Sequence, residues 1–439
     1  MLVRVDARGA FADRALPAEA RRAGLDHRQR GQALRLTYGV LQRRLTLDTL
    51  ADALADRDTL HLPRAPRAAL RLGLYELLFS DGTPAHAAVD AAVELAKPAG
   101  PRIAGLVNAL LRRASREGAE WMDGLSDATA AQAAVRHSHP PWLAEMWFQT
   151  LGPDSARALM AADNEPAERA VRANALRITA PDLAVALAAA GVGTNPVPGL
   201  AEGLVLDGPF DLAGSELFDN GALMPQSRAS MLVARTLAPA AGGRVLDLCA
   251  APGAKTTHLA VLAGADARID AVERHPGRAQ ELTRTCARLG ADGVRIHVGE
   301  AAAFAACRPG RYDAVLVDPP CTGLGTLRSH PDLRWRVSED DIARLAAIQL
   351  ELLNAGAGAL VDGGVLLYST CTVTRPENDG ILDALLGAHD ELEPAPPDSG
   401  LPLWDHAHMP GRLQTVPSRD GTDGFFLARV RRRTGSGPS

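Results

Sequence analysis

Two cysteines stand in short motifs whose neighbours suit covalent chemistry. Cys321 ends the run Asp318-Pro-Pro-Cys, and Cys371 ends the run Tyr368-Ser-Thr-Cys. A thiolate is a strong nucleophile, and a carboxyl group beside it can assist at the group under attack. A lone cysteine is more often a small buried hydrophobe, and we assign that role to the three cysteines outside these motifs: Cys249, Cys286 and Cys307.

Both motifs follow stretches that are typical of buried strands. Ala314–Val317 precedes Asp318, and Val365–Ser369 leads into Cys371. Neighbouring parallel strands lie ~4.8 Å apart. Two thiols at the ends of such strands, 50 residues apart in sequence, can therefore converge on one substrate atom.

Two thiols and a carboxyl group suit methyl transfer to carbon-5 of a pyrimidine. That carbon is too weak a nucleophile to attack a methylsulfonium. Addition of a thiolate at carbon-6 turns it into an enamine, a carboxylic acid at N3 helps this addition, and the methylated adduct then loses the C5 proton and the thiol. A free thiol has a pKa of ~8.5, so the nucleophile needs surroundings that favour the thiolate. The available cations are Lys255, Arg328 and His330.

A loop of small residues predicts a binding site for a nucleoside. Val245–His258 is a hydrophobic strand, a tight turn and a helix start. Small side chains let backbone N–H groups approach a ligand closely. The spacings GxxxxGK[ST] and GxGxxG, which hold phosphates, are both absent. The candidate loop residues are Cys249, Ala250, Ala251, Pro252, Gly253, Ala254 and Lys255.

Two carboxylates complete this candidate site. Glu273 ends the second expected strand, 20 residues beyond Gly253, a position that suits a carboxylate accepting both hydroxyls of a ribose. Glu300 follows the third expected strand, where a polar group can contact an adenine edge. A nucleoside without a pyrophosphate fits, and S-adenosylmethionine is such a ligand. The alternative, an ordinary turn with scattered carboxylates, explains Glu273 alone about as well, but explains the whole set poorly.

The elements that must position these residues alternate between strands and helices. Such alternation predicts an α/β domain with a doubly wound parallel sheet, and ligands bind at the carboxyl ends of its strands. The expected strands are Arg244–Leu248, Ile269–Val272, Val294–Val298, Ala314–Val317 and Val365–Ser369.

Upstream of this sheet the pattern changes twice. Apolar residues recur at helical spacing over the first ~135 residues, and 121–141 reads as a mixed linker. Short helices and extended segments broken by Gly and Pro follow. We therefore expect an all-helical domain at 1–136, a small α+β subdomain at 141–239 and the catalytic α/β domain at 240–434.

Composition restricts the class of protein. The chain has 439 residues and a net charge of −5, although Met1–Arg136 carries 20 Lys and Arg against 16 Asp and Glu. That local excess suits nucleic acid or a solvated helical face. No apolar run reaches the ~18 residues of a membrane span, and no signal peptide is recognised. Five cysteines without a CxxC pair argue against disulfides or zinc. We expect a monomeric protein of the reducing cytoplasm, without a metal or a membrane anchor.

With these motifs assembled, the sequence resembles the Sun family of RNA cytosine-C5 methyltransferases over nearly its whole length. The resemblance includes Val107–Arg113 (VNALLRR), in what corresponds to a NusB-like helical domain, and the closing run Asp423–Arg429 (DGFFLAR). It implies a Rossmann-like, S-adenosylmethionine-dependent methyltransferase core, mostly parallel. It also implies that a specific cytosine of small-subunit (16S) ribosomal RNA is the substrate.

The resemblance also implies a role for each site residue. Cys249–Lys255 becomes the cofactor loop, Glu273 the ribose ligand and Glu300 the adenine contact. Asp318 lies between cofactor and cytosine. Cys371 becomes the nucleophile and Cys321 the residue that assists product release. Chemistry alone leaves the two cysteine roles open, because DNA cytosine methyltransferases use the Pro-Cys thiol as nucleophile.

The sequence departs from the family pattern at four places. Glu273 and Glu300 stand where the family usually has Asp, and a longer carboxylate keeps the role with a small shift. Pro252–Lys255 reads Pro-Gly-Ala-Lys in place of Pro-Gly-Gly-Lys. Gln226-Ser227 replaces Gln-Asp, which leaves the contact of that segment open.

Other functions remain as alternatives. The target could be a cytosine in tRNA or another RNA, or the chain could be an RNA-binding factor with a vestigial core. An amino-group methyltransferase would carry an aromatic residue where Cys321 stands. The target base must leave its stack, and four aromatic residues are candidates to contact RNA: Trp142, Trp147, Tyr368 and Trp335. Trp335 looks exposed between two arginines, but a core tryptophan that anchors the substrate loop explains it about as well.

Overall fold

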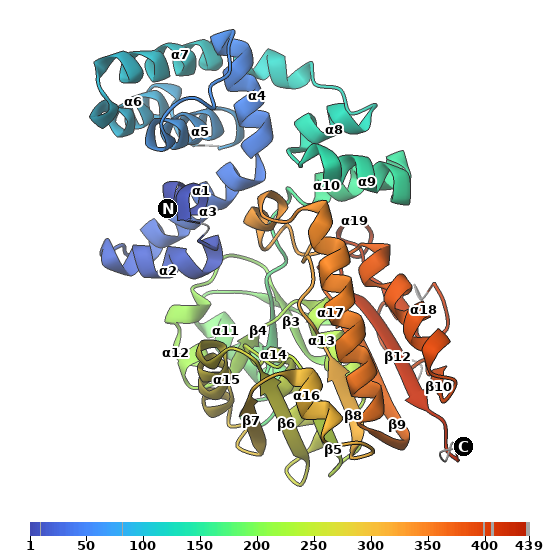
Figure 1. The fold of residues 1–439 in the computed structure, drawn as a ribbon. Helices are drawn as coiled ribbons and strands as arrows, with labels where there is room; N and C mark the ends of the chain where they lie inside the picture. The colour runs from blue at the N-terminus through green and yellow to red at the C-terminus, as the bar shows by residue number, and fades with distance from the viewer. Residues whose placement is uncertain (9, 81, 398–399, 405–407, 436–439) are drawn as a thin grey trace. The chain divides into compact units, whose positions relative to one another are not determined.

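The computed structural model describes residues 1–8, 10–80, 82–397, 400–404 and 408–435. The chain forms two compact units (Figure 1). The first unit contains 1–166 together with 327–337, and the second contains 167–326 with 338–439. This division by contacts does not coincide with the expected boundaries at 136 and 141, because the helices after residue 141 pack with the helical unit.

The first unit is entirely helical. Its core is built from the apolar faces of α4 to α7, and Leu47, Leu74 and Leu111 are fully buried there. Its elements are α1 (Leu2–Arg8), α2 (Ala12–Arg22), α3 (His27–Gln42), α4 (Arg44–Ala55), α5 (Arg64–Phe79), α6 (Ala85–Ala96), η1 (Lys97–Ala99), α7 (Pro101–Asp123), α8 (Ala130–His137), α9 (Pro141–Leu151), α10 (Pro153–Ala162) and η3 (Pro331–Trp335).

The expectation of a linker at 121–141 is wrong, because helices occupy its first residues and its middle. Helix α7 continues to Asp123, and α8 occupies Ala130–His137. A capping box starts α8, because the Thr129 hydroxyl accepts from the Gln132 N–H and the Gln132 side chain accepts from the Thr129 N–H. Such reciprocal capping satisfies N–H groups that the first helical turn leaves unpaired.

The segment 327–337 is anchored in the first unit by buried side chains. Arg334 is fully buried and donates to the carbonyl oxygens of Ser138 (3.0 Å) and Asp163 (3.1 Å). The Trp335 indole N–H donates to the Leu41 carbonyl at 2.7 Å. Trp335 is half-buried, which agrees with the alternative of an anchoring tryptophan and not with that of an exposed RNA contact. Burial of its neighbour Arg334 turns this run into an anchor.

The second unit begins with a small antiparallel sheet, which confirms the expected α+β subdomain. Its strand order is β2-β3-β1-β4. The strands pack against helix α11 through fully buried residues such as Val171, Leu183 and Leu223. The elements are β1 (Ala170–Ala173), α11 (Ala180–Ala189), β2 (Thr194–Val197), β3 (Leu200–Leu206), η2 (Leu212–Gly214), α12 (Glu216–Asp219) and β4 (Leu223–Pro225).

The remainder of the second unit is a doubly wound α/β domain, as expected. The sheet order is β10-β12-β9-β8-β5-β6-β7, with β11 paired to β12. Strands β5 to β9 are parallel, and β12 runs antiparallel to β9. The strands are β5 (Arg244–Asp247), β6 (Arg268–Glu273), β7 (Val294–Val298), β8 (Tyr312–Val317), β9 (Leu360–Thr370), β10 (Leu392–Pro394), β11 (Arg412–Gln414) and β12 (Phe426–Arg432).

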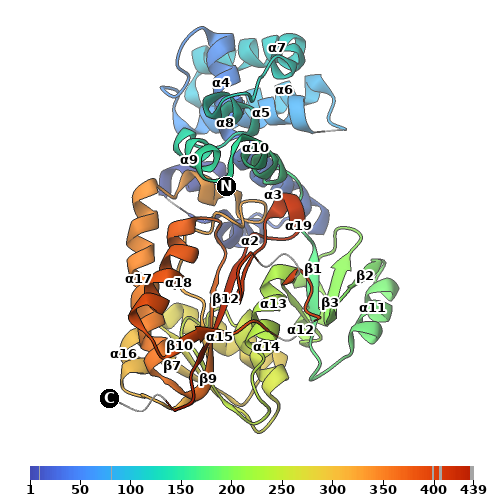
Figure 2. The ribbon, with the colours of Figure 1, turned by 90° about the vertical axis from the view of Figure 1, so that its right-hand side faces the viewer.

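Helices cover both faces of this sheet, and Figure 2 shows α17 and α18 on one side with α13 and α14 on the other. Successive strand residues point to opposite faces, so Leu246 and Leu366 join the first core while Val245 and Leu367 join the second. The helices are α13 (Arg228–Leu237), α14 (Ala254–Ala263), α15 (Pro276–Leu289), α16 (Ala301–Ala306), α17 (Glu339–Gly358), η4 (Arg375–Glu377), α18 (Asp379–Ala388) and α19 (Pro417–Asp420). Within the described residues, none of the helices is long and apolar enough to cross a membrane.

Candidate active site

The two motif cysteines meet at the carboxyl ends of β8 and β9. These strands are neighbours in the parallel sheet, with Val317 opposite Tyr368. The Sγ atoms of Cys321 and Cys371 lie 3.4 Å apart. Two loops that are 50 residues apart in sequence therefore present one pair of thiols.

The pKa of one of the two thiols is raised. A hydrogen bond with Cys371, and then burial, raise the pKa of Cys321 well above its ordinary value. Cys321 is therefore kept as a thiol, whose S–H can donate to the sulfur of Cys371.

A partly buried ion pair lies beside the thiols. The Lys255 Nζ donates to Asp318 Oδ2 at 2.6 Å, and the Ser369 hydroxyl donates to Asp318 Oδ1 at 2.7 Å. Burial is the largest single influence and lowers the pKa of Lys255, but the charge of Asp318, the hydrogen bond to it and the contributions of Cys371 and Asp247 together outweigh burial, so the pKa is raised. Lys255 therefore keeps its positive charge next to Cys371.

The other two candidate cations belong to the first unit and have partners there. Arg328 donates to the Pro166 carbonyl at 2.5 Å, and His330 lies 3.8 Å from Asp13. Among the three candidate cations, Lys255 interacts electrostatically with Cys371.

The small-residue loop connects β5 to α14. Gly253 has φ +109°, and a Cβ there would lie 2.9 Å from Leu282 Cδ1, so this position requires glycine. The Ala250 N–H donates to the Val272 carbonyl at 3.0 Å and fixes the turn against β6. Pro252 and Ala254 flank the glycine, and α14 begins at Ala254.

Two residues at the start of this loop are deeply buried. Burial raises the pKa of Asp247 to about 7, although a hydrogen bond from the Thr256 hydroxyl (2.7 Å) opposes the rise. Burial, and then the charge of Asp247, raise the pKa of Cys249. The Cys249 thiol is thus kept protonated, which fits the inert role that the sequence assigns to it. Cys286 is buried as expected, whereas Cys307 is exposed, so the expectation of a buried side chain is wrong for Cys307.

Glu273 ends β6 with a buried carboxylate, 5% exposed as a residue. Its Oε1 accepts from the His275 N–H at 2.8 Å, and its Oε2 lies 3.7 Å from Arg278 Nε, beyond hydrogen-bond distance. Arg278 donates instead to the Ala251 carbonyl at 2.6 Å. The Oε2 atom of Glu273 therefore has acceptor capacity left for a ligand such as a ribose diol.

Glu300 is arranged differently. Its side chain is 63% exposed, and Oε1 pairs with Arg274 Nε at 2.8 Å. It occupies the N-cap position of α16 without a capping hydrogen bond. The structure brings Lys255, Asp318, Cys321 and Cys371 together, whereas Glu300 stands in a surface ion pair.

Glu377, which the sequence reasoning missed, ties the two cysteine loops together. This fully buried carboxylate accepts from the N–H of Thr322 (2.8 Å), and from the hydroxyls of Thr322 and Thr374 (2.6 Å each). Gln349 Nε2 donates to it at 3.1 Å. The hydroxyls of Thr322 and Thr372, the residues after each cysteine, lie 2.7 Å apart. The signal in the sequence was the run Thr372, Thr374 and Glu377 directly after Cys371, together with Thr322 directly after Cys321.

Two of the aromatic candidates for RNA stacking are wrong. Trp147 and Tyr368 are fully buried. The Tyr368 hydroxyl donates to the Glu377 carbonyl at 2.6 Å, and it therefore supports the same loop. Trp142 is half-buried. Among the described residues, no group of three His, Cys, Asp or Glu side chains is placed to hold a metal ion.

Comparison with known proteins places this site in a family. Residues 234–431 match the model of the 16S rRNA methyltransferases RsmB/F, 1–116 match the NusB family, and 139–213 match an RsmF/B-like ferredoxin-like domain. The ribosomal RNA small subunit methyltransferase B of Thermus thermophilus is 38% identical over 435 residues, which cover 98% of this chain and 96% of that protein. The chain belongs to the RsmB/F family of 16S rRNA methyltransferases.

A further family member and a solved structure align with nearly the whole chain, and a second solved structure aligns with part of it. A probable ribosomal RNA small subunit methyltransferase B of Bacillus subtilis is 33% identical and covers 98% of this chain and 97% of its own. The crystal structure of PH0851 has a TM-score of 0.84 at 26% identity, with 98% and 97% of the two chains covered. A methyltransferase homologue from Pyrococcus horikoshii has a TM-score of 0.60 at 28% identity and covers 70% of this chain and all of its own. S-adenosylmethionine is the cofactor of this family's methyltransferase fold.

Proposed function

We propose that this RsmB/F family member methylates C5 of a cytosine in small-subunit ribosomal RNA through a covalent adduct between Cys371 and C6. The observation that carries the proposal is the pair of thiols 3.4 Å apart, with the Lys255–Asp318 ion pair beside them. An amino group is nucleophilic without covalent help, so an amino-group methyltransferase has no use for such a pair. The ribosomal substrate rests on the names of the relatives.

The two cysteines take different steps. The positive charge of Lys255 and the hydrogen bond from Cys321 favour the thiolate of Cys371, which adds to C6. The bond S–C6 forms, and the electron pair of the C5–C6 double bond becomes available at C5 for the methyl group. Afterwards a base removes the C5 proton, and the electron pair of that C–H bond restores the double bond and expels Cys371. We assign Cys321 to this release step and Asp318 to the N3 side of the cytosine.

The residues of the α/β domain fit the cofactor, which supplies an electrophilic methyl group when bound. We assign the loop Cys249–Lys255 to its backbone contacts and Glu273 to the ribose, because Glu273 Oε2 has acceptor capacity left. Asp318 lies between cofactor and cytosine. The assignment of Glu300 to the adenine edge requires its side chain to leave Arg274. The three-domain division at 1–136, 141–239 and 240–434, RNA as the partner and the monomeric state belong to the same proposal.

The test is the chemical identity of the methylated nucleoside. The full chain is incubated with 16S ribosomal RNA, and in a parallel reaction with transfer RNA, together with cofactor carrying a labelled methyl group, and each RNA is digested to nucleosides. We expect the label in 5-methylcytidine, and none when Cys371→Ala replaces the parent protein. Label in N4-methylcytidine would overturn the proposed chemistry. Label in transfer RNA with none in 16S RNA would overturn the substrate.

Glu273→Ala is expected to weaken cofactor binding by roughly one to two orders of magnitude. A charge-assisted hydrogen bond to a carboxylate is worth ~1.5–3 kcal/mol, and ~1.4 kcal/mol corresponds to a factor of ten. Calorimetric titration of the folded variant measures the change. The matched control is Glu281→Ala on α15, whose side chain is exposed. If the two variants bind the cofactor with equal affinity, the assignment of Glu273 to the ribose is contradicted.

A further inference from the structure

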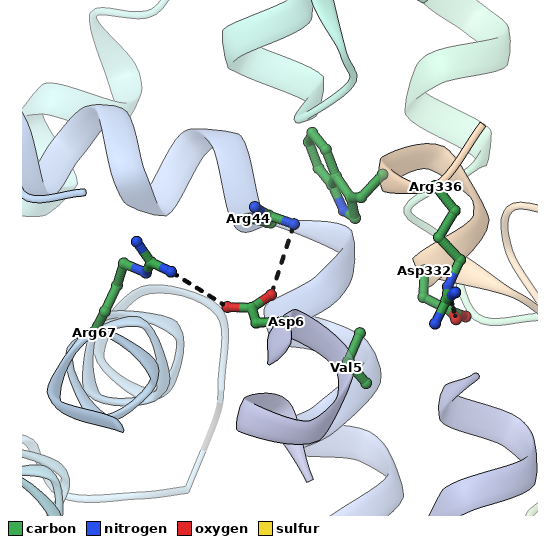
Figure 3. A pocket seen from close by; sticks show the side chains of 7 residues that line it. Val5, Asp6, Arg44, Arg67, Asp332 and Arg336 are labelled. Carbon is green, nitrogen blue, oxygen red and sulfur yellow. Dashed lines mark hydrogen bonds and ion pairs between the residues drawn. The ribbon is translucent and has the colours of Figure 1, made fainter. Parts of the chain in front are cut away.

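The first unit contains a charged cavity of about 310 Å³ that the proposed reaction does not use. It lies among α1, the start of α4, the start of α5 and η3 (Figure 3). Arginines dominate its polar wall. The residues that line it are Val5, Asp6, Arg44, Arg67, Asp332, Trp335 and Arg336.

Both carboxylates of the cavity already have strong partners. Asp6 accepts from Arg71 Nη1 at 2.8 Å. Asp332 accepts from Arg336 Nε at 2.9 Å and from the Ala12 N–H at 3.3 Å. Each carboxylate is therefore held by an arginine of its own, and neither neutralises a further cation at hydrogen-bond distance.

Arg44 and Arg67 have most of their guanidinium donors unused among the described residues. Figure 3 shows them on two sides of Asp6, but the nitrogen–oxygen distances are 3.7 Å for Arg44 and 4.0 Å for Arg67. Arg44 makes no hydrogen bond to any residue that the structure describes. Arg67 donates from Nη1 to the Leu60 carbonyl at 2.8 Å, and its buried Nε has no acceptor among the described residues.

The guanidinium groups of Arg44 and Arg67 also repel each other electrostatically. Burial, and then the positive charge of Arg71, lower the pKa of Arg44, and Arg67 contributes in the same direction. Side chains that are only 30% exposed in Arg44 and 16% exposed in Arg67 cannot satisfy all their N–H donors with water. An anion in the cavity would supply the missing acceptors and relieve the repulsion.

We propose that this cavity binds a phosphate group of the RNA backbone through Arg44 and Arg67. A guanidinium fork matches two oxygens of a phosphate. Trp335 forms an apolar wall, with the Arg44 guanidinium carbon 5.3 Å from its ring centroid, and the volume exceeds that of a phosphate and leaves room for an adjoining ribose. RNA as the source of the phosphate rests on the proposed function, and the net charge of +4 over Met1–Arg136 agrees with it.

The test is the salt dependence of RNA binding by the full chain. Each phosphate contact contributes ~0.7 to 0.9 to the slope of log K against log salt. We expect the double variant Arg44→Ala, Arg67→Ala to bind a 16S RNA fragment roughly tenfold more weakly, with a slope smaller by ~1 in magnitude. The control is Arg64→Ala, Arg102→Ala, which removes the same charge from exposed positions of the same unit. Slopes that are equal in the two double variants would overturn the proposal.

Further experiments distinguish RNA from free phosphate as the ligand, and a loss of phosphate binding from a loss of folding. Thermal unfolding measured at increasing inorganic phosphate concentration tests the cavity without RNA, because a bound phosphate raises the unfolding temperature. If the Arg44 and Arg67 variant loses this stabilisation but binds RNA as well as the control does, RNA is overturned as the source of the phosphate. Arg44→Lys, Arg67→Lys keeps both charges and must restore most of the slope if folding is intact. RNA binding does not depend on which atom is methylated. The result of this experiment can therefore be interpreted even if the C5 proposal fails.

Discussion

Cys371→Ala abolishes both methylation and any covalent complex with RNA, and Cys321→Ala accumulates such a complex: this is the expected result for the thiol pair. Without the sulfur of Cys371 no bond to C6 forms. Without Cys321, attack and methyl transfer still proceed but the adduct is not released, so protein and RNA remain joined after denaturation.

Denaturing gel electrophoresis of protein with labelled RNA measures the adduct. The variant lacking both cysteines is expected to show none, since the adduct trapped by Cys321→Ala needs Cys371. Cys307→Ala, at an exposed position outside the site, is the control and should behave like the parent chain. An adduct trapped by Cys371→Ala and lost in Cys321→Ala would reverse the two roles.

Glu377→Ala is expected to destabilise the second unit by ~3 kcal/mol or more. Its removal leaves the buried N–H of Thr322 without its acceptor and takes one of two acceptors from the Gln349 amide, which also donates to the Pro320 carbonyl, and an unsatisfied buried donor costs ~1–3 kcal/mol. At ~2–4 °C per kcal/mol for domains of this size, the midpoint of unfolding falls by roughly 6–12 °C.

Thermal unfolding followed by circular dichroism measures the loss. Glu351→Ala on α17 is the control, because that side chain is exposed on the helix that carries Gln349. Glu377→Gln keeps the shape and one acceptor oxygen, so it should retain more stability than the alanine variant. A midpoint for Glu377→Ala within 2 °C (roughly 1 kcal/mol) of the control would contradict the role of this carboxylate.

The sheet and the meeting of the thiols were within reach of sequence reasoning. Periodicity identified the strands that became β5 to β9, and the rule that parallel strands end at one edge placed Cys321 and Cys371 together before any coordinates. The strand β9 begins five residues earlier than expected, because its first residues pair with β8 only around a register shift.

Contacts between distant segments were beyond reach. The pairing of Glu300 with Arg274 depends on side-chain directions at two strand ends. Burial of Arg334 depends on carbonyl oxygens that come from three separate segments, at Gln42, Ser138 and Asp163. A pattern along the chain carries no information on such acceptors, so the arginines around Trp335 resembled a solvated surface.

The anchoring of 327–337 in the first unit also orders events during synthesis. Helices α1 to α10 leave the ribosome first. Arg334 and Trp335, which complete the same unit, are translated about 170 positions after Pro166. At ~5–20 residues per second, the nascent helical unit waits roughly 10–30 s with the carbonyl oxygens of Leu41 and Ser138 open to water. The N-terminal unit of this protein is therefore completed only after the small sheet and strands β5 to β8 of the large sheet have been translated.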